Sequence, residues 1–280
     1  MWSYFVVNFK IKKTDGEKFI TRADWILYFL ARKGCRVLFE CHQTSKIRTI
    51  IINRLKSYPN VKFIFLNEHL EDYYKMDGSN SRVLHNGVDT EMFRNSTGKL
   101  WNQREGLVFV GNLKRFNKER GIDFIIDAFY KSKLLQDCKL SIVGGPNHEA
   151  EKLEKKIREL NLQKVIKVTG RLGRSEIVEI YANSKIGILI NSSSSQHSYK
   201  YTSPLKYFEY IYMGLNVIGI DFPSHRTLPR NNEIAFFQED DASSFEVAVK
   251  QALEKNPKGD VDRECLSLDV RAKKIISLLE

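Results

Sequence analysis

The hydrophobic positions of the chain fall into two patterns that follow one another along the sequence. Short apolar runs predict buried strands, and apolar residues repeated at spacings of three and four predict amphipathic helices between them. Strands that alternate with helices are typical of a parallel sheet connected by helical crossovers. The pattern therefore predicts an α/β protein.

The alternation is most regular from Leu107 onward, where it predicts one doubly wound domain. The expected strands are Leu107–Val110, Leu140–Val143, Val165–Thr169, Ile186–Ile190, Val217–Ile220 and Ile234–Phe237. The expected helices are Ile122–Ser132, Glu149–Leu160, Ser175–Ala182, Pro204–Met213 and Ser243–Glu254. In such a domain ligands bind at the carboxyl ends of the strands, so the loops there are candidates for a site.

The residues before this domain predict a second, smaller α/β region. Its expected strands are Phe19–Thr21, Arg36–Glu40 and Lys62–Leu66, and its expected helices are Ala23–Lys33 and Ile47–Tyr58. A polar stretch at residues 94–104, which contains Gly98, predicts the linker between the two regions. We therefore expect domains at residues 1–95 and 105–265.

The composition is that of a folded globular protein with an excess of positive charge. The hydrophobic fraction is 42% and the net charge is +11, which favours an anionic partner: a phosphate-bearing substrate, nucleic acid or an acidic membrane surface. The four cysteines are dispersed without metal-site spacing, as expected of reduced thiols in a cytosolic protein. No apolar run approaches the roughly 18 residues that suggest a membrane-spanning helix.

Three glycine-containing loops follow predicted strands. The first, residues 111–121, is the densest cationic loop of the chain, and arginine and lysine side chains are the usual ligands of phosphate. Its candidate cations are Lys114, Arg115, Lys118 and Arg120. An ordinary solvated basic loop is the alternative interpretation.

The second loop contains Gly144 and Gly145, where absent side chains would let a ligand approach the backbone. It lacks the spacing of a nicotinamide-binding loop and the ending of a P-loop, which argues against both classes. Taken alone, it is better explained as a tight turn. The third loop, GRLGR, begins at Gly170 and could contact a base through its backbone or simply turn the chain.

The helix expected after Ser203 carries the clearest binding pattern. Ser203 can cap it, Pro204 suits its first position, and Lys206 and Glu209 share one side. Free N–H groups at its start suit a diphosphate, and the Glu209 carboxylate suits ribose hydroxyls, so the helix could hold a sugar nucleotide. A capped amphipathic helix with a solvated lysine and glutamate is the alternative.

One histidine, His42, follows Glu40 at the end of a predicted strand. A lone histidine is more often structural than catalytic. The chain has no Ser-His-Asp or Cys-His set at a recognisable spacing, so nucleophilic hydrolysis has little support.

Taken together, these motifs resemble the retaining family 4 glycosyltransferases of GT-B fold, over residue 20 to the C-terminus. The matching segments, in order, are VLHNGVDTEMF, FVGNLKRFNKERGIDFIIDAF, LSIVGGP, VTGRLGR, SPLKYFEYIYMGLNVIGID and LDVRAKKIISLL. The resemblance implies two Rossmann-like domains. The N-terminal, acceptor-binding one is incomplete, and residues 266–280 form a helix that crosses back to it. The chain would then be a truncated product, a short member of the family, or one completed by a partner.

The resemblance also implies transfer of a sugar from a nucleotide-sugar donor to an acceptor hydroxyl, with retention at the anomeric carbon and without a metal or other cofactor. Cationic side chains and helix N–H groups would then stabilise the leaving diphosphate. By position, Lys118 or Arg120 matches the family's lysine and Arg115 its arginine. Glu209 matches the ribose-binding glutamate, and His42 stands where the family often has a histidine near the sugar.

The donor contacts implied by the resemblance are spread over the three loops and the helix. They are expected at Gly111, Asn112, Gly144, Gly145, Gly170, Arg171, Leu172, Tyr201, Ser203, Pro204, Leu205, Lys206 and Glu209. Two positions depart from the family pattern. Tyr201 stands where the family has the first of its two glutamates, and Asn112 stands where many members have arginine.

The expected partners are a nucleotide-sugar donor and a glycan or lipid-linked acceptor, used in polysaccharide or glycolipid assembly in the cytoplasm. The basic surplus could add peripheral contact with the inner face of the membrane. Two alternatives belong to other classes. A nucleotide-sugar-binding module would bind donor without turnover, and a nucleic-acid-binding protein would bind with steep salt dependence. No recognition motif supports the latter, so no nucleic acid is expected. The oligomeric state is not predicted.

Overall fold

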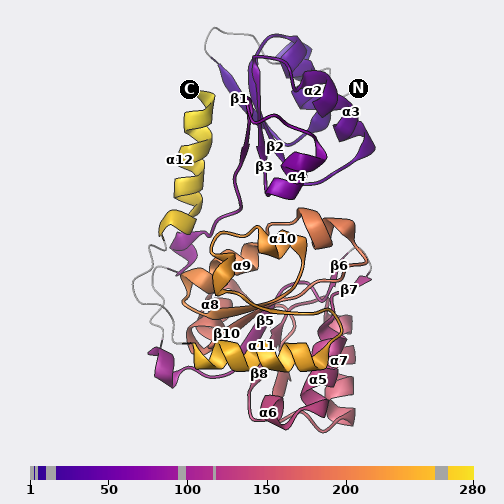
Figure 1. The fold of residues 1–280 in the computed structure, drawn as a ribbon, viewed down its shortest axis with the longest axis vertical. Helices are drawn as coiled ribbons and strands as arrows, with labels where there is room; N and C mark the ends of the chain where they lie inside the picture. Colours follow the sequence, from indigo (N-terminus) through magenta and orange to yellow (C-terminus); the bar gives the residue numbers. More distant parts are fainter. Residues whose placement is uncertain (1–2, 4–5, 11–16, 94–98, 116–117, 256–263) are drawn as a thin grey trace. The chain divides into compact units, whose positions relative to one another are not determined.

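The computed structural model describes residues 3, 6–10, 17–93, 99–115, 118–255 and 264–280. The chain divides into two compact units (Figure 1). Unit 1 consists of Met1–Asn86, Lys200–Ser203 and Asp269–Glu280, and unit 2 consists of Gly87–Tyr199 and Pro204–Leu268. The division therefore falls between Asn86 and Gly87, whereas the linker predicted at residues 94–104 belongs to unit 2 and lies partly outside the described residues.

Unit 1 is built on a four-stranded parallel sheet with the strand order β1-β2-β3-β4. Its strands are β1 (Lys18–Thr21), β2 (Arg36–Cys41), β3 (Val61–Phe65) and β4 (Ser81–Val83). Its helices are α2 (Asp24–Arg32), α3 (Lys46–Leu55), α4 (Glu68–Tyr73) and, from Asp269 on, α12 (Leu268–Leu279), with a π-helical turn at Val6–Lys10. Because consecutive strands are neighbours, right-handed crossovers place α2 and α3 on the same face of this sheet.

Local sequence explains where the helices of unit 1 begin. The Ser45 hydroxyl accepts a hydrogen bond from the Arg48 N–H at the start of α3, and the Asn67 side chain accepts one from the Leu70 N–H at the start of α4. The amide of Asn67 also donates to the carbonyls of Lys200 and Thr202. Asn67 therefore fixes the short segment Lys200–Ser203, which unit 1 receives from the middle of the chain.

Unit 2 contains a six-stranded parallel sheet with the order β12-β11-β10-β5-β8-β9 and a two-stranded hairpin, β6-β7. The strands are β5 (Leu107–Val110), β6 (Lys114–Arg115), β7 (Lys118–Glu119), β8 (Leu140–Val143), β9 (Ile166–Val168), β10 (Ile186–Leu189), β11 (Asn216–Ile220) and β12 (Ala235–Phe237). The helices are α5 (Ile122–Lys131), α6 (Lys133–Gln136), α7 (Asn147–Glu159), α8 (Arg174–Asn183), α9 (Leu205–Tyr212), α10 (Pro223–Arg226) and α11 (Ala242–Glu254). Short helical turns lie at Thr90–Phe93, Trp101–Gln103, Asn231–Glu233 and Glu264–Leu266, and a further turn at His197–Tyr201 is shared between the two units.

Helices cover both faces of the unit 2 sheet (Figure 1). Buried side chains of α5, α7 and α11 form one apolar core on one face, and those of α8 and α9 form a second core on the other. The strand order changes direction between β5 and β10, because β8 and β9 lie to one side of β5 and the later strands lie to the other. Ligands of doubly wound domains bind at the carboxyl ends of the strands near such a switch point.

The predicted α/β class is confirmed, and each of the six strands and five helices expected after Leu107 exists with its ends displaced by two residues at most. One detail was wrong. The helix α9 begins at Leu205 with Pro204 as its N-cap residue, and Ser203 does not cap it. The Ser203 hydroxyl instead accepts a hydrogen bond from the N–H of Asn86 at 3.1 Å. In the part of the chain that is described, no helix is long and apolar enough to cross a membrane.

Candidate functional site

The three predicted glycine loops lie side by side at the carboxyl edge of the unit 2 sheet. The N–H of Gly111 donates to the carbonyl of Val143 at 2.9 Å, and the N–H of Gly144 donates to the carbonyl of Gly170 at 2.7 Å. These bonds continue the pairing of β5 with β8 and of β8 with β9 beyond the strand ends. The three loops are therefore hydrogen-bonded neighbours, and each follows a strand as the sequence pattern predicted.

Two glycines of these loops have no room for a side chain. A Cβ atom at Gly144 would lie 1.8 Å from the carbonyl oxygen of Gly111, and one at Gly145 would lie 2.8 Å from Cγ of Arg171. The Arg171 side chain consequently runs across Gly145. Glycine at these positions lets the loops pack closely, and both residues are buried, with the Arg171 side chain covering Gly145.

Arg120 is fixed at the ends of the two strands that flank the switch point. Its Nε donates to Oδ1 of Asn191 at 2.9 Å, and its Nη2 donates to the carbonyl of Ile190 at 3.1 Å. Its Nη1 donates to the carbonyl of Asn112 at 3.2 Å, and the guanidinium lies over the Phe109 ring. These contacts hold a permanent positive charge at the carboxyl edge of the sheet.

Two more predicted cations, Arg115 and Lys118, lie opposite each other in the register of the β6-β7 hairpin. The placement of their side chains lies outside the described residues. The hairpin is tied to the domain by Lys114, whose Nζ lies 2.9 Å from Oε1 of Glu149 on α7. The hydrogen bond from Lys114 lowers the pKa of Glu149. The carboxylate therefore stays charged, and its ion pair with Lys114 of the hairpin is maintained.

The helix α9 is anchored beneath the sheet by Tyr210. The Tyr210 hydroxyl accepts from the N–H of Val110 at 3.2 Å, and its ring lies so close to β10 that a Cβ at Gly187 would be 2.4 Å from it. The glycine in the middle of β10 is thus explained by this close approach. Because Tyr210 is anchored here, the position of the next residue back along the helix, Glu209, is fixed as well.

Glu209 and Lys206 share one side of α9, as their spacing predicted. The Lys206 Nζ lies 2.6 Å and 2.9 Å from the two carboxylate oxygens of Glu209. The carboxylate also accepts a hydrogen bond from the buried hydroxyl of Tyr181 on α8 at 2.7 Å. Burial raises the pKa of Tyr181 well above its ordinary value, so this hydroxyl remains a donor. These contacts fix the orientation of the Glu209 carboxylate.

The remaining predicted donor residues are divided between the two units. Pro204 and Leu205 begin α9 in unit 2, where Leu205 is exposed, and Leu172 packs partly against a core of that unit. Tyr201 and Ser203 belong to unit 1. Tyr201 is buried there, with its ring 5.6 Å from that of Tyr73.

The predicted histidine, His42, belongs to a charged cluster in unit 1. Its Nε2 lies 3.0 Å from Oε1 of Glu40, and the same oxygen accepts from Nη2 of Arg271 on α12 at 2.5 Å. Oε2 of Glu40 accepts from Nε of Arg22 at 2.7 Å. Burial alone would raise the pKa of Glu40, but the hydrogen bonds and positive charges of these three neighbours lower it to about 2.

Sequence reasoning missed three residues that orient the candidate site residues. Asn191 lies two residues after the end of β10, so its place near a strand end was a signal that could have found it. Tyr181 and Arg271 gave no such signal, because they reach Glu209 and Glu40 only through the tertiary fold. Among the described residues, no group of three or more His, Cys, Asp or Glu side chains could hold a metal ion.

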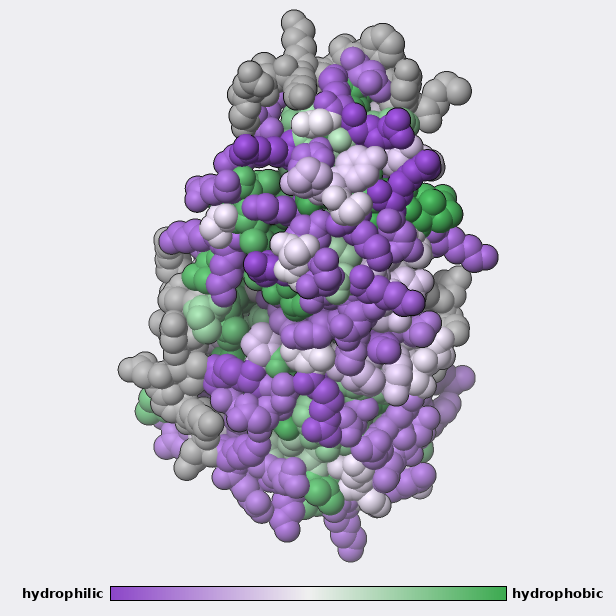
Figure 2. All heavy atoms as spheres, turned by 45° about the horizontal axis from the view of Figure 1, so that its top comes forward, coloured by the Kyte–Doolittle hydropathy of each residue, from purple (hydrophilic) through white to green (hydrophobic). Residues whose placement is uncertain are grey.

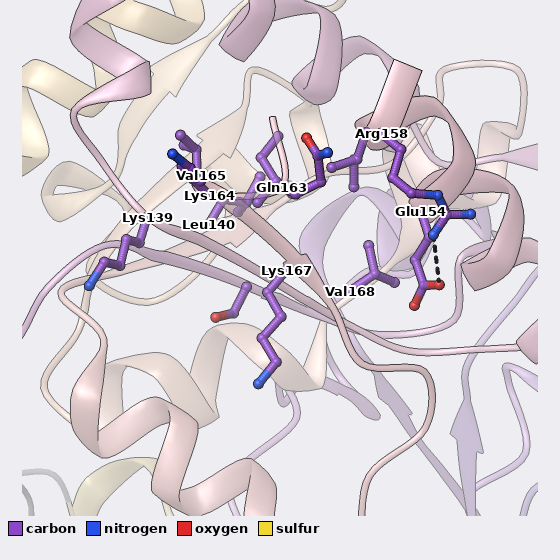
Figure 3. A pocket seen from close by; sticks show the side chains of 12 residues that line it. Lys139, Leu140, Glu154, Arg158, Gln163, Lys164, Val165, Lys167 and Val168 are labelled. Carbon is purple, nitrogen blue, oxygen red and sulfur yellow. Dashed lines mark ion pairs between the residues drawn. The ribbon is translucent and has the colours of Figure 1, made fainter. Parts of the chain in front are cut away.

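A pocket of about 450 Å³ lies elsewhere in unit 2, along α7, β8 and the edge strand β9 (Figure 3). Figure 3 shows Lys139, Lys164 and Lys167 around it, with Arg158 paired to Glu154. None of the predicted site residues lines this pocket. Lysines beside a short edge strand have a general structural role, because they discourage pairing with another strand.

The sequence matches a known protein family over more than half of the chain. A sequence model of the family described as "Glycosyl transferases group 1" matches residues 98–265. The chain belongs to this family. The glycine loops, Arg120 and the α9 pair all lie within the matched residues. No curated protein matches the chain.

Solved structures show that the chain has the GT-B glycosyltransferase fold. It is similar to a glycosyltransferase from Rickettsia africae, with a TM-score of 0.73 and 15% identity over 99% of this chain and 78% of that one. It is also similar to sucrose-phosphate synthase from Thermosynechococcus elongatus, with a TM-score of 0.69 and 15% identity over 99% of this chain and 75% of the synthase. A third similar structure is the Anabaena protein HepE in complex with UDP and glucose, with a TM-score of 0.67 and 12% identity over 94% of this chain and 77% of HepE. At these identities the likeness concerns the fold.

Proposed function

We propose that this glycosyltransferase binds a nucleotide-sugar donor on unit 2 and transfers the sugar to an acceptor hydroxyl with retention and without a metal. The observation that carries the proposal is the Glu209 carboxylate on α9, whose orientation is fixed by Lys206 and Tyr181 within the family-matched residues. A carboxylate of fixed orientation is suited to accept hydrogen bonds from two neighbouring ribose hydroxyls. We therefore propose that Glu209 binds the ribose of the donor.

The diphosphate of the donor is proposed to bind at the carboxyl edge of the sheet, beside Arg120 and the glycine loops. During transfer the bond between the sugar carbon and the diphosphate breaks, the acceptor oxygen forms the new bond to that carbon, and the acceptor hydroxyl gives up its proton to the leaving diphosphate. Negative charge then develops on the leaving diphosphate. Arg120 is already oriented by Asn191, so its charge would stabilise that group without reorganisation, aided by Arg115 and Lys118 of the hairpin.

The acceptor is proposed to be a glycan or a lipid-linked sugar bound by unit 1, where His42 lies beside Glu40. The proposed setting is polysaccharide or glycolipid assembly at the cytoplasmic face of a membrane, with peripheral contact. The family relationship supports sugar transfer, and the complex of HepE with UDP and glucose makes UDP the first nucleotide to test.

The test is a thermal-shift and calorimetric panel of UDP, GDP, ADP and CMP with the wild-type chain. A nucleotide present at about 100 times its Kd should stabilise the folded chain by about 2.7 kcal/mol. The Glu209→Gln variant keeps an acceptor for Tyr181 but loses the charge, so its affinity should fall by about tenfold, the cost of one charge-assisted hydrogen bond. Glu159→Gln, an exposed change on α7, is the matched control and should bind as the wild type does.

Two outcomes would contradict the proposal: no nucleotide binds, or Glu209→Gln binds as tightly as the control. Donor binding without transfer to any acceptor would favour the alternative of a binding module. Where transfer occurs, activity in excess EDTA tests metal independence, and the anomeric configuration of the product, read by proton NMR, tests retention.

A further inference from the structure

Most of the net positive charge of the chain comes from unit 1. By sequence, unit 1 has 19 lysine and arginine residues against 10 aspartate and glutamate residues, a net charge of +9. Unit 2 has 26 against 24, a net charge of +2. The proposed donor site is in unit 2, so phosphate binding by a donor does not account for the excess in unit 1. An anionic partner of unit 1 would account for it.

The outer side of α3 combines exposed apolar and basic side chains. Ile47 is 50% exposed and Ile50 is 65% exposed. Lys46 and Arg54 are exposed as well, four residues before and four residues after Ile50, so these side chains share one side of the helix. The helix contains no acidic residue. An amphipathic surface of this composition is typical of helices that lie on anionic membranes.

The neighbouring helix α2 adds an aromatic cluster. Trp25 is 49% exposed, and its ring stacks on Phe29 and meets the edge of Tyr28, with centroid distances of 6.2 Å and 6.0 Å. The guanidinium of Arg32 lies over the Tyr28 ring at 5.8 Å. Tryptophan and tyrosine are enriched at membrane–water interfaces, because their rings are apolar and each has one polar group.

The two helices lie next to each other on one face of the unit 1 sheet (Figure 1). An ion pair of 2.6 Å between Arg48 and Asp24 joins their first turns, so Ile47 and Trp25, the chain neighbours of this pair, lie at the same end of both helices. Figure 2, which brings the upper part of Figure 1 forward, shows apolar and hydrophilic residues mixed over the surface in this view. We name this surface, defined by Trp25, Lys46, Ile47, Ile50 and Arg54, the α2–α3 face.

We propose that the α2–α3 face docks on the surface of an anionic lipid bilayer. The net positive charge of unit 1 favours an anionic partner, and the exposed isoleucines and tryptophan favour a partner that can also bury apolar side chains. A lipid bilayer has an anionic surface and an apolar interior, whereas the phosphate backbone of a nucleic acid cannot bury Ile50. The inference rests on the proposed membrane contact and deepens it by assigning the residues, and its test requires neither donor nor turnover.

The experiment is flotation of the full chain with vesicles of phosphatidylcholine alone or with about one third phosphatidylglycerol. The wild type should bind the anionic vesicles and should release as salt is raised, because the attraction is screened. Removing both cations in Lys46→Gln/Arg54→Gln should weaken binding by about fivefold for each charge. Removing the apolar groups in Ile47→Ser/Ile50→Ser should weaken it by about tenfold.

Matched controls separate the face from general effects of charge and hydrophobicity. Val247→Ser removes an equally exposed apolar side chain from α11 of unit 2, and Lys250→Gln removes an exposed cation there, and both should bind as the wild type does. Circular dichroism confirms that each variant is folded, and nucleotide binding by the Ile47→Ser/Ile50→Ser chain confirms an intact unit 2. Equal binding to neutral vesicles, wild-type binding by the isoleucine double variant, or tighter binding to duplex DNA than to anionic vesicles would each overturn the proposal.

Discussion

Two arginines bind the same carboxylate of unit 1, and we predict very different consequences of removing them. Arg271 on α12 and Arg22 after β1 both contact Glu40. The Arg271 side chain is 11% exposed and also donates to the carbonyls of His85 and Leu84, whereas the Arg22 side chain is 64% exposed. Replacing each with glutamine removes the same charge from the same partner in different solvent environments.

The expected magnitudes follow from burial. Removing one partner of a buried ion pair costs about 3–5 kcal/mol, and Arg271→Gln should lie near 3 kcal/mol, because Arg22 and His42 still contact Glu40. An exposed pair contributes about 1 kcal/mol or less, since solvent screens it, so Arg22→Gln should fall in that range. Arg271 also connects α12 to the rest of unit 1, so its loss should loosen the end of the chain.

Urea denaturation followed by circular dichroism measures the free energy of unfolding of the two variants and the wild type. Hydrogen exchange of the peptide covering residues 269–280 gives a local measure. A loss of 3 kcal/mol corresponds to exchange roughly a hundredfold faster. The helix α11 in unit 2 is the internal reference and should keep its protection in both variants. Equal destabilisation by the two changes, or a larger effect of Arg22→Gln, would refute the argument from burial.

Two further predictions concern Glu40, on β2 of unit 1, and Gly144, which follows β8 of unit 2. The folded-state pKa of Glu40 is about 2, against an ordinary value of 4.5, so its ionisation stabilises the native state above about pH 5. This contribution of about 3 kcal/mol is lost as pH falls toward 2. Denaturation at several pH values should show the wild type losing more stability than Glu40→Gln over this range, and parallel curves would contradict it. Gly144→Ala places a Cβ 1.8 Å from the Gly111 carbonyl, so it should destabilise unit 2 by more than about 2 kcal/mol and abolish nucleotide binding, whereas Gly78→Ala, with no atom nearby, should cost about 1 kcal/mol for its positive φ. Melting curves with and without nucleotide decide this comparison, and similar melting temperatures for the two alanine variants would contradict the steric argument.

The regular elements of unit 2 could be predicted because their signals are local. Strands such as β10 and β11 are apolar throughout, and the helices between them carry one apolar side, so each could be found without knowledge of the fold. The carboxyl-edge loops followed from the same pattern, since parallel strands end at one edge. The β6-β7 hairpin was missed because Lys114–Glu119 is almost entirely polar and its strands are two residues long.

The details of the candidate site depend on partners that are distant in sequence. Ser203 was expected to cap α9, but its hydroxyl accepts a hydrogen bond from the N–H of Asn86, which is 117 residues away. Arg120 is oriented by Asn191, 71 residues away, and nothing near either residue in the sequence predicts that hydrogen bond. Spacing along a helix, by contrast, is local, and it correctly placed Lys206 beside Glu209.

The short segment Lys200–Ser203 has a consequence for attempts to recombine this protein with its relatives. The chain passes from one unit to the other four times, because unit 1 is assembled from three separate pieces of sequence. One of these pieces supplies Tyr201 to the unit 1 core and is fixed by Asn67. A chimera made with a single crossover near Gly87 would therefore combine a unit 1 from one parent with core residues from the other. Exchange of unit 1 between such proteins requires that all three pieces be transferred together.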